Sequence, residues 1–293
     1  MRIVFIGTVG FSRSALEHLV SIGADIVGVC TLKESKFNSD HVDLSQISAL
    51  HGIPWLYAND INSAEVMDWI KNKAPDIVFC FGWSKLLKQG ILELAPLGVL
   101  GYHPAALPKN RGRHPLIWAL VLGLKKTAST FFFMDDGADS GDILSQREIE
   151  INDEDDAGSL YEKITQVALS QMEEFIPRLI SNTYQRQNQD ESLVNSWRKR
   201  GQLDSLIDWR MSAKSIHNLV RGLAKPYVGA GFVTEGQEVK VWKTRLVCGA
   251  PHNIEPGKVL KVENDKSIIK CGEDSICLLV TEPPFNPHLG SYL

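Results

Sequence analysis

The sequence has little of what marks a secreted, membrane-spanning or metal-holding protein. Its five cysteines are odd in number and include no CxxC pair, so neither a disulfide framework nor a structural zinc site is expected. No apolar run approaches the roughly 20 residues that a membrane span needs. The N-terminal MRIVFIG is too short for a signal peptide and is typical of a first strand. We therefore expect a cytoplasmic protein with no membrane partner and no bound metal.

An excess of charge of one sign is also missing. The chain of 293 residues has 31 Lys and Arg against 35 Asp and Glu, a net charge of -4. Such a balance gives no general attraction to nucleic acid or to anionic lipid. The length allows one large domain and a smaller one.

Apolar runs alternate with helical patterns in the first half of the chain. Residues 2–6, 24–32, 76–81 and 98–103 are almost wholly apolar, as expected of parallel strands buried on both faces. Amphipathic segments lie between them, so we predict an α/β fold with a doubly wound, mostly parallel, Rossmann-like sheet. The first turn is GTVG rather than GxGxxG, which argues against a dinucleotide site.

The composition changes near residue 182. Residues 183–204 are polar and rich in Asn and Gln, which predicts a linker or a long exposed excursion. From Gly229 onward the chain gives short β-like runs at the spacing of a small barrel or sandwich. The predicted organisation is an N-terminal domain of residues 1–182, a linker of residues 183–204, and a smaller β-rich, barrel-like domain of residues 205–293.

The candidate chemistry lies in residues 98–144. His103 ends an apolar run, and Asp139 lies 36 positions later in the loop GADSG. The two meet only if two strands end side by side, and active sites of such sheets gather at the strand ends. A histidine oriented by a carboxylate is a general acid and base. The alternative for Asp139 is a plain turn residue between two glycines.

A basic loop follows His103. It contains Lys109, Arg111, Arg113 and His114 and is bordered by prolines. Arginine in such a loop can clamp a phosphate or a carboxylate with paired donors. A solvated basic loop without a ligand is the alternative.

Four motifs resemble those of one family. They are HPxxLP at residues 103–108, RG at 111–112, PxxW at 115–118 and DxGDIL at 139–144. With the spacing from His103 to Asp139, the chain resembles the folate-dependent formyltransferases. These include methionyl-tRNA formyltransferase, glycinamide ribonucleotide formyltransferase and the sugar-nucleotide N-formyltransferases. The likeness is close over about the first 180 residues. The second half resembles the sugar-nucleotide N-formyltransferases more loosely, through LIDW at 206–209 and residues 216–230.

The resemblance implies formyl transfer from N10-formyltetrahydrofolate to an amine. His103 would stabilise the developing oxyanion and pass a proton to the leaving nitrogen, and Asp139 would orient His103. The residues expected to hold this co-substrate are Gly82, Trp83, Lys85, Leu87, Asp135, Gly137 and Asp139.

One position departs from the family pattern. The family usually has asparagine two residues before the histidine, and here that residue is Gly101. Loss of one oxyanion donor lowers rates by about 10²–10³ in other enzymes. Either a nearby donor replaces it, or the enzyme is slower, or the site has a different role. Asn110 and Tyr102 are the nearby candidates, and Asn110 is our predicted catalytic donor.

The charge and the length of the second half indicate the kind of acceptor. From Ser205 onward there are 11 Lys and Arg against 9 Asp and Glu, which argues against a tRNA-binding domain. The extra residues argue against the small purine-pathway enzyme. The expected acceptor is therefore a UDP- or dTDP-linked 4-amino-4,6-dideoxy sugar, an intermediate on the way to pseudaminic acid being one example, with no nucleic acid as partner.

The residues expected to contact this sugar nucleotide are Gly10, Phe11, Ser12, Tyr102, Lys109, Arg111, Arg113 and His114, with Trp209 and Tyr227 for the base. Methionyl-tRNA formyltransferase is the alternative enzyme. A folate- or sugar-nucleotide-binding module without catalysis is the alternative of another class. Whether the chain forms a homodimer stays open.

Overall fold

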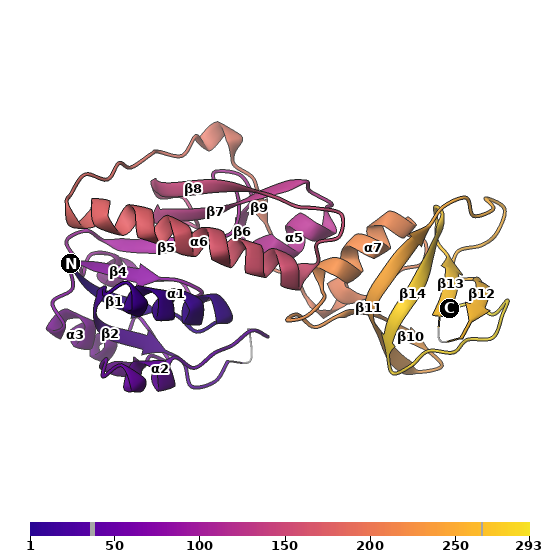
Figure 1. The fold of residues 1–293 in the computed structure, drawn as a ribbon, viewed down its shortest axis with the longest axis horizontal. Coiled ribbons are helices and arrows are strands. Elements are labelled where there is room, and N and C mark those ends of the chain that lie inside the picture. Colours follow the sequence, from indigo (N-terminus) through magenta and orange to yellow (C-terminus); the bar gives the residue numbers. More distant parts are fainter. Residues whose placement is uncertain (36–38, 265) are drawn as a thin grey trace. The chain divides into compact units, whose positions relative to one another are not determined.

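The computed structural model describes residues 1–35, 39–264 and 266–293, which form two compact units (Figure 1). Unit 1 comprises Met1–Gly112, Ala128–Ile149 and Glu162–Trp197. Unit 2 comprises Arg113–Thr127, Glu150–Tyr161 and Arg198–Leu293. The chain therefore passes between the units several times, and the domain boundaries expected at residues 182 and 205 stay a prediction.

A sheet of seven strands forms the centre of unit 1. Its order is β3-β2-β1-β4-β5-β7-β8, parallel from β3 to β5 and antiparallel between β5 and β7. The strands are β1 (Arg2–Ile6), β2 (Asp25–Thr31), β3 (Trp55–Tyr57), β4 (Ile77–Cys80), β5 (Val99–His103), β7 (Lys126–Phe133) and β8 (Ile143–Glu150). The predicted mostly parallel sheet is confirmed.

Helices cover both faces of this sheet (Figure 1). They are α1 (Gly10–Ser21), α2 (Ser45–Leu50), α3 (Ala64–Asn72), α4 (Gln89–Leu92) and α6 (Ala157–Ile180). Because side chains alternate along a strand, Ile6 packs with Ile70 of α3 on one face. Phe79 meets Phe175 of α6 on the other face, with ring centroids 6.4 Å apart. Both faces are thus buried, which explains the continuous apolar runs in the sequence.

The turn after β1 and the turn after β4 are tied together at one edge of the sheet. The Ser12 hydroxyl accepts from the main-chain N–H groups of Thr8 and Val9, each at 3.1 Å, and donates to the Phe81 carbonyl at 2.5 Å. Gly82 has φ +71°, and a Cβ there would lie 2.2 Å from the Val9 side chain. Only glycine allows this close approach.

Unit 2 is built from helices and an antiparallel sheet of five strands. The sheet order is β10-β11-β14-β13-β12. The elements are α5 (Pro115–Val121), α7 (Ala213–Gly222), β10 (Ala230–Thr234), β11 (Gln237–Val247), β12 (Val259–Glu263), β13 (Lys266–Lys270) and β14 (Ser275–Glu282). The predicted β-rich C-terminal part is confirmed.

Four short elements complete the chain, namely β6 (Arg111–Gly112), β9 (Ser196–Trp197) and the 3-10 helices η1 (Glu191–Leu193) and η2 (Gln202–Ser205). Strand β9 pairs with β6 in parallel. Within the described ranges, no helix is long and apolar enough to cross a membrane.

Candidate active site

His103 is held by partners on both ring nitrogens. It ends β5 and is 4% exposed. Its Nε2 lies 2.8 Å from the carbonyl oxygen of Asn110, and its Nδ1 lies 3.6 Å from Oδ2 of Asp139. Since a carbonyl only accepts, Nε2 is the donor in the first contact, and Nδ1 is the atom that faces the carboxylate.

The two residues that face His103 both have left-handed backbone. Asn110 has φ +64° and Asp139 has φ +56°. Such conformations are uncommon for residues other than glycine and cluster at functional sites. The Asp139 carboxylate also accepts from the N–H of Gly112 at 2.9 Å, so it reaches beyond its own turn.

Gly101 lies on the same face of β5 as His103, where the family's asparagine side chain is expected. A Cβ at Gly101 would lie 2.8 Å from Cγ of Met134 and 3.0 Å from the ring of Phe132. Apolar side chains therefore fill the space. The contact between Asn110 and His103 is made by the main-chain carbonyl, so the role of the Asn110 amide stays a prediction.

Tyr102, the other expected donor, alternates to the opposite face of β5. Its hydroxyl lies 3.1 Å from Ser129 Oγ, and burial raises its pKa well above the usual range. Its ring stacks on Phe11, with centroids 4.2 Å apart. These contacts favour a packing role for both aromatic residues, and their contact with an acceptor stays a prediction.

The two loops expected to hold the co-substrate differ in character. Leu87 is buried, and it packs with Trp83 and Met134 in one apolar cluster. The buried Nε1 of Trp83 has no hydrogen-bond partner within the part of the chain that the structure describes. Contact of these side chains with the co-substrate stays a prediction. Lys85 instead donates to the Asn59 carbonyl.

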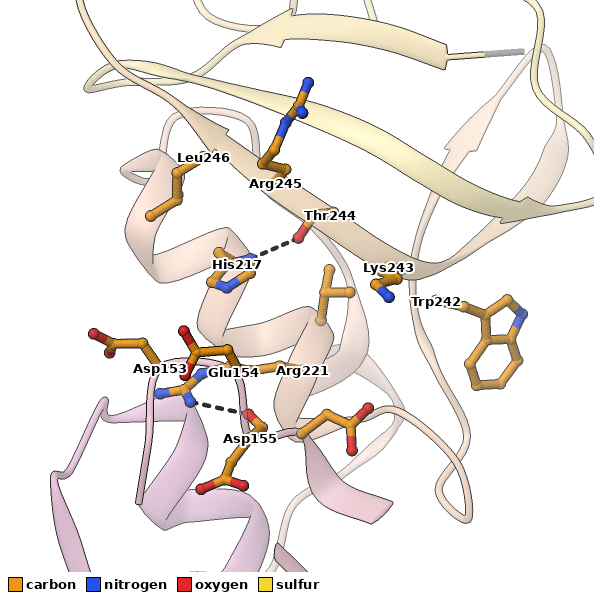
Figure 2. Close-up of a pocket in the computed structure, with 12 residues that line it drawn as sticks. Asp153, Glu154, Asp155, His217, Arg221, Trp242, Lys243, Thr244, Arg245 and Leu246 are labelled. Carbon is orange, nitrogen blue, oxygen red and sulfur yellow. Dashed lines mark hydrogen bonds between the residues drawn. The ribbon is translucent and has the colours of Figure 1, made fainter. Parts of the chain in front are cut away.

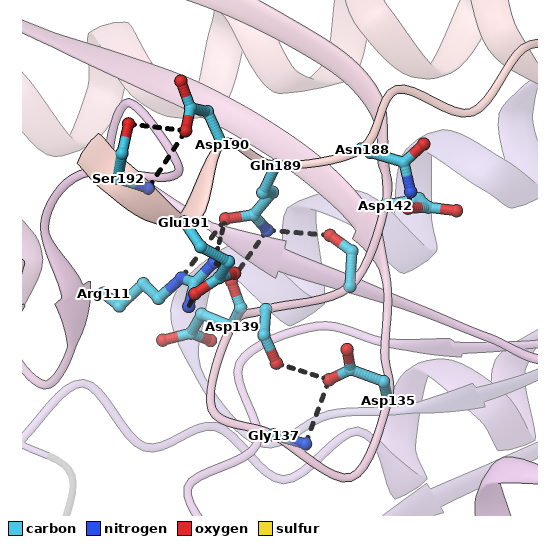
Figure 3. Close-up of polar contacts among 12 residues, drawn as sticks. Arg111, Asp135, Gly137, Asp139, Asp142, Asn188, Gln189, Asp190, Glu191 and Ser192 are labelled. Atoms are coloured by element: carbon cyan, nitrogen blue, oxygen red, sulfur yellow. Dashed lines mark hydrogen bonds and ion pairs between the residues drawn. The ribbon is translucent and has the colours of Figure 1, made fainter. Parts of the chain in front are cut away.

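The second loop is closed by its own carboxylate. Asp135 Oδ1 accepts from the N–H of Gly137 at 3.0 Å and from the Ser140 hydroxyl at 2.6 Å (Figure 3). Asp135 and Gly137 therefore shape the loop that leads to Asp139.

Arg111 is buried and engaged by the chain itself. It is 7% exposed, and its Nη2 lies 2.7 Å from Oε1 of Glu191 and 2.8 Å from Oε1 of Gln189 (Figure 3). Its guanidinium thus anchors residues of the expected linker. Lys109 in the same loop is exposed.

The remaining residues that were expected to contact the formyl-accepting substrate differ in their surroundings. Gly10 donates its N–H to the Asp40 carbonyl at 3.0 Å. Trp209 is buried in the core of unit 2, and Tyr227 packs against that core. His114 begins α5 with φ +55°, and burial, with nearby Arg113 next in effect, lowers its pKa. Acceptor contacts of these residues stay predictions.

Residues 187–197 contain contacts that sequence reasoning missed. Gln189 Nε2 donates to the carbonyls of Asp139 at 2.8 Å and Gly141 at 2.7 Å. Asn195 Oδ1 accepts from the N–H of Asn110 at 2.9 Å. The polar composition of this segment predicts a linker. The side-chain amides of Gln and Asn both donate and accept hydrogen bonds, and they were the signal in the sequence that could have indicated these contacts.

Unit 2 holds a separate cavity of about 450 Å³ (Figure 2). Its walls are the acidic turn 153–156, His217 and Arg221 of α7, and residues 242–246 of β11. Arg221 donates to the Asp155 carbonyl at 3.0 Å, and His217 Nδ1 lies 2.9 Å from Thr244 Oγ1. No predicted site residue lines it. Among described residues, no group of three or more His, Cys, Asp and Glu could hold a metal ion.

Comparison with known proteins shows the family. Residues 1–176 match the family model "Formyl transferase", and residues 201–287 match "Formyl transferase, C-terminal domain". The chain belongs to the formyl transferase family. Its members use N10-formyltetrahydrofolate as co-substrate, so the expected enzyme class and co-substrate are confirmed.

The full-length relatives include methionyl-tRNA formyltransferases. The one from Acetivibrio thermocellus is 31% identical over 282 residues, covering 95% of this chain and 90% of the relative. The one from Bacillus subtilis is 28% identical over 287 residues, covering 97% and 90%. The solved structure of WlaRD, a sugar 3N-formyl transferase, matches with a TM-score of 0.70 and 18% identity, covering 94% and 96%. That likeness shows the fold alone.

The expected acceptor was wrong. The curated relatives at about 30% identity over 95% of the chain are methionyl-tRNA formyltransferases, which contradicts a nucleotide-linked amino sugar and the exclusion of nucleic acid. The physical reason lies in the charge count, which began at Ser205. It left out Arg198, Lys199 and Arg200, and a net charge over a domain does not report a local cluster.

Proposed function

We propose that this protein transfers the formyl group of N10-formyltetrahydrofolate to the amino group of methionyl-tRNA. The observation that carries the proposal is the 31% identity to a methionyl-tRNA formyltransferase over 95% of the chain. A cytoplasmic location is part of the proposal, because the acceptor is found there.

A cluster of cations in unit 2 supports a nucleic-acid acceptor. Arg198, Lys199 and Arg200 are consecutive, and Trp118 donates its indole N–H to the Arg198 carbonyl at 3.0 Å. The guanidinium carbons of Arg200 and Arg198 are 4.7 Å and 5.4 Å from the Trp118 ring centroid. Cations bind phosphates, and arginine over an aromatic ring is a common surface for nucleotides.

The chemistry assigns a task to each side chain near His103. The co-substrate supplies an activated formyl carbon. We expect the backbone of residues 82–87 to contact its flat ring. Amide formation takes a proton from the attacking amine and requires one on the departing nitrogen, and His103 relays it at Nδ1. Asp139 stabilises the protonated ring.

A formylation assay with methionyl-tRNA and N10-formyltetrahydrofolate tests this proposal. We expect the wild type to form formyl-methionyl-tRNA, and His103→Asn and Asp139→Asn to lower kcat by about 10²–10⁴. Binding of 5-formyltetrahydrofolate, measured by calorimetry, is the control for an intact pocket. Wild-type rates in either variant would exclude its catalytic role, and a wild type that does not formylate methionyl-tRNA would exclude the acceptor.

The cation cluster has its own test. Arg200→Gln should weaken tRNA binding and lower the slope of log affinity against log salt by about 1. Lys261→Gln removes an exposed cation elsewhere in unit 2 and serves as the control. An unchanged slope in Arg200→Gln would contradict a phosphate contact.

A further inference from the structure

Residues 187–197, here called the strap, make hydrogen bonds with Arg111 and with the loop that contains Asp139 and Asp142 (Figure 3). Gln187 exchanges two main-chain hydrogen bonds with Ile143, of 2.8 Å and 2.9 Å. At the other end, Ser196 and Trp197 pair with β6. Between these points Asn188 donates to Asp142 Oδ1 at 2.8 Å. The strap is therefore attached to the catalytic unit along its length.

Two side-chain amides of the strap hold the two residues that face the imidazole. Gln189 donates to the carbonyl of Asp139, whose carboxylate faces Nδ1 of His103. Asn195 accepts from the N–H of Asn110, whose carbonyl faces Nε2. Each ring nitrogen thus has a partner that one strap amide holds in place.

The backbone of both held residues needs such support. Asp139 and Asn110 have positive φ, and left-handed residues other than glycine persist where the surrounding structure holds them. Gln189 also donates to the carbonyl of Gly141, so its two N–H groups clamp both sides of the Asp139 turn.

Arg111 determines how the Gln189 amide is oriented. Its Nη2 and Nε donate to Oε1 of Gln189 at 2.8 Å and 3.2 Å. Because a guanidinium has only donors, the oxygen of the amide must face Arg111 and the NH₂ must face the turn. Glu191 pairs with the same guanidinium and fixes it in turn.

We propose that Gln189 and Asn195 are positioning residues for formyl transfer, acting through Asp139 and Asn110 to set the orientation of the His103 ring. The inference rests on the roles of His103 and Asp139 in the proposed function. Gln189 is the stronger of the two, since it is partly buried, whereas water reaches the exposed Asn195.

Exchange of amide for acid gives opposite expectations at the two positions. Gln189→Glu keeps the oxygen that accepts from Arg111 but loses both N–H donors, so kcat should fall by about ten- to a hundredfold with KM for the folate little changed. The kcat of Gln189→Met should fall by a similar factor. Asn195→Asp keeps the accepting oxygen, so its kcat should stay near that of the wild type. Asn195→Ala loses this oxygen, and its kcat should fall by less than that of the Gln189 variants. Asn188→Ala, from the same strap, is the control and should match wild type.

A second readout does not depend on the acceptor. The ring ¹⁵N and ¹H signals of His103, assigned with His103→Asn, should move in Gln189→Glu and Gln189→Met and stay in place in Asn188→Ala. If the signals move while the wild type does not formylate methionyl-tRNA, the acceptor is wrong and the positioning role stands. Wild-type kcat and signals in both Gln189 variants would overturn the proposal. A loss confined to Gln189→Glu, or an equal loss in Asn188→Ala, would also overturn it.

Discussion

Replacing Gly101 by asparagine should destabilise the protein unless Met134 is shortened as well. The new Cβ would lie 2.8 Å from Met134 Cγ and 3.0 Å from the Phe132 ring, closer than side-chain atoms pack. Overpacking costs about 1–3 kcal/mol, and a poorly paired buried amide adds about 1–3 kcal/mol. We expect the free energy of unfolding to fall by about 2–6 kcal/mol in Gly101→Asn, measured by urea denaturation.

Met134→Ala removes the obstructing atoms. Alone, this substitution should lower the free energy of unfolding by about 2 kcal/mol. This value is the low end for truncation of a methionine, because Met134 is only partly buried. In the double variant the two changes should be less destabilising than their sum by about 1 kcal/mol or more, since the residues compete for one space. Strict additivity would refute the packing argument.

The same double variant tests the missing amide. If an amide at position 101 stabilises the oxyanion, Gly101→Asn with Met134→Ala should have a higher kcat than Met134→Ala alone, by up to about 10². Gly101→Leu with Met134→Ala is the matched control, because leucine has the shape of asparagine without its donor. Equal rates in the two double variants would refute a catalytic use of this position.

Three further predictions concern stability. Ser12→Ala leaves two main-chain N–H groups and one carbonyl of the paired turns without their partner, so the free energy of unfolding should fall by about 2–4 kcal/mol; a fall below about 0.5 kcal/mol in urea denaturation would contradict this. Arg111→Met removes the ion that holds residues 187–197, so limited proteolysis should cut there sooner than in the wild type; an unchanged pattern would show that the strap is held without it. Burial, with Arg221 and Lys214 next, lowers the pKa of His217, so the stability from its neutral ring is full above about pH 6.5 and is lost as pH falls below that value. Melting temperatures of His217→Gln should therefore drop less than those of the wild type between pH 7.5 and pH 5, and parallel curves would exclude this linkage.

The sheet could be predicted from the sequence, because strands buried on both faces, such as 77–80 and 99–103, must be apolar throughout. The expected His103–Asp139 pair is present, but the expectation that two strands end side by side is wrong. Strand β7 runs antiparallel to β5, with Phe133 opposite Leu100, so the loop after Phe133 brings Asp139 to His103. The partners of the imidazole could not be predicted in this way. The main-chain carbonyl of Asn110 accepts a hydrogen bond from Nε2 of His103 because the backbone of Asn110 is left-handed, and Asn195 helps to hold that backbone. No pattern of residue types predicts this geometry.

The polar residues 183–204 show the limit of composition as a guide. Few apolar side chains predict little burial, and most of these residues are indeed exposed. These residues stabilise the loops around the imidazole through hydrogen bonds, in particular those of Gln189. Composition alone does not distinguish such bonds from hydrogen bonds to water.

The repeated passage of the chain between the two units has a consequence for modularity. The chain leaves unit 1 after Gly112 and again after Trp197, and these two residues are neighbours in the β6–β9 pair. A fragment that ends at residue 182 would contain His103 and Asp139 but none of residues 187–197. Exchange of whole halves between related enzymes should therefore keep the strap with the half that contains the histidine.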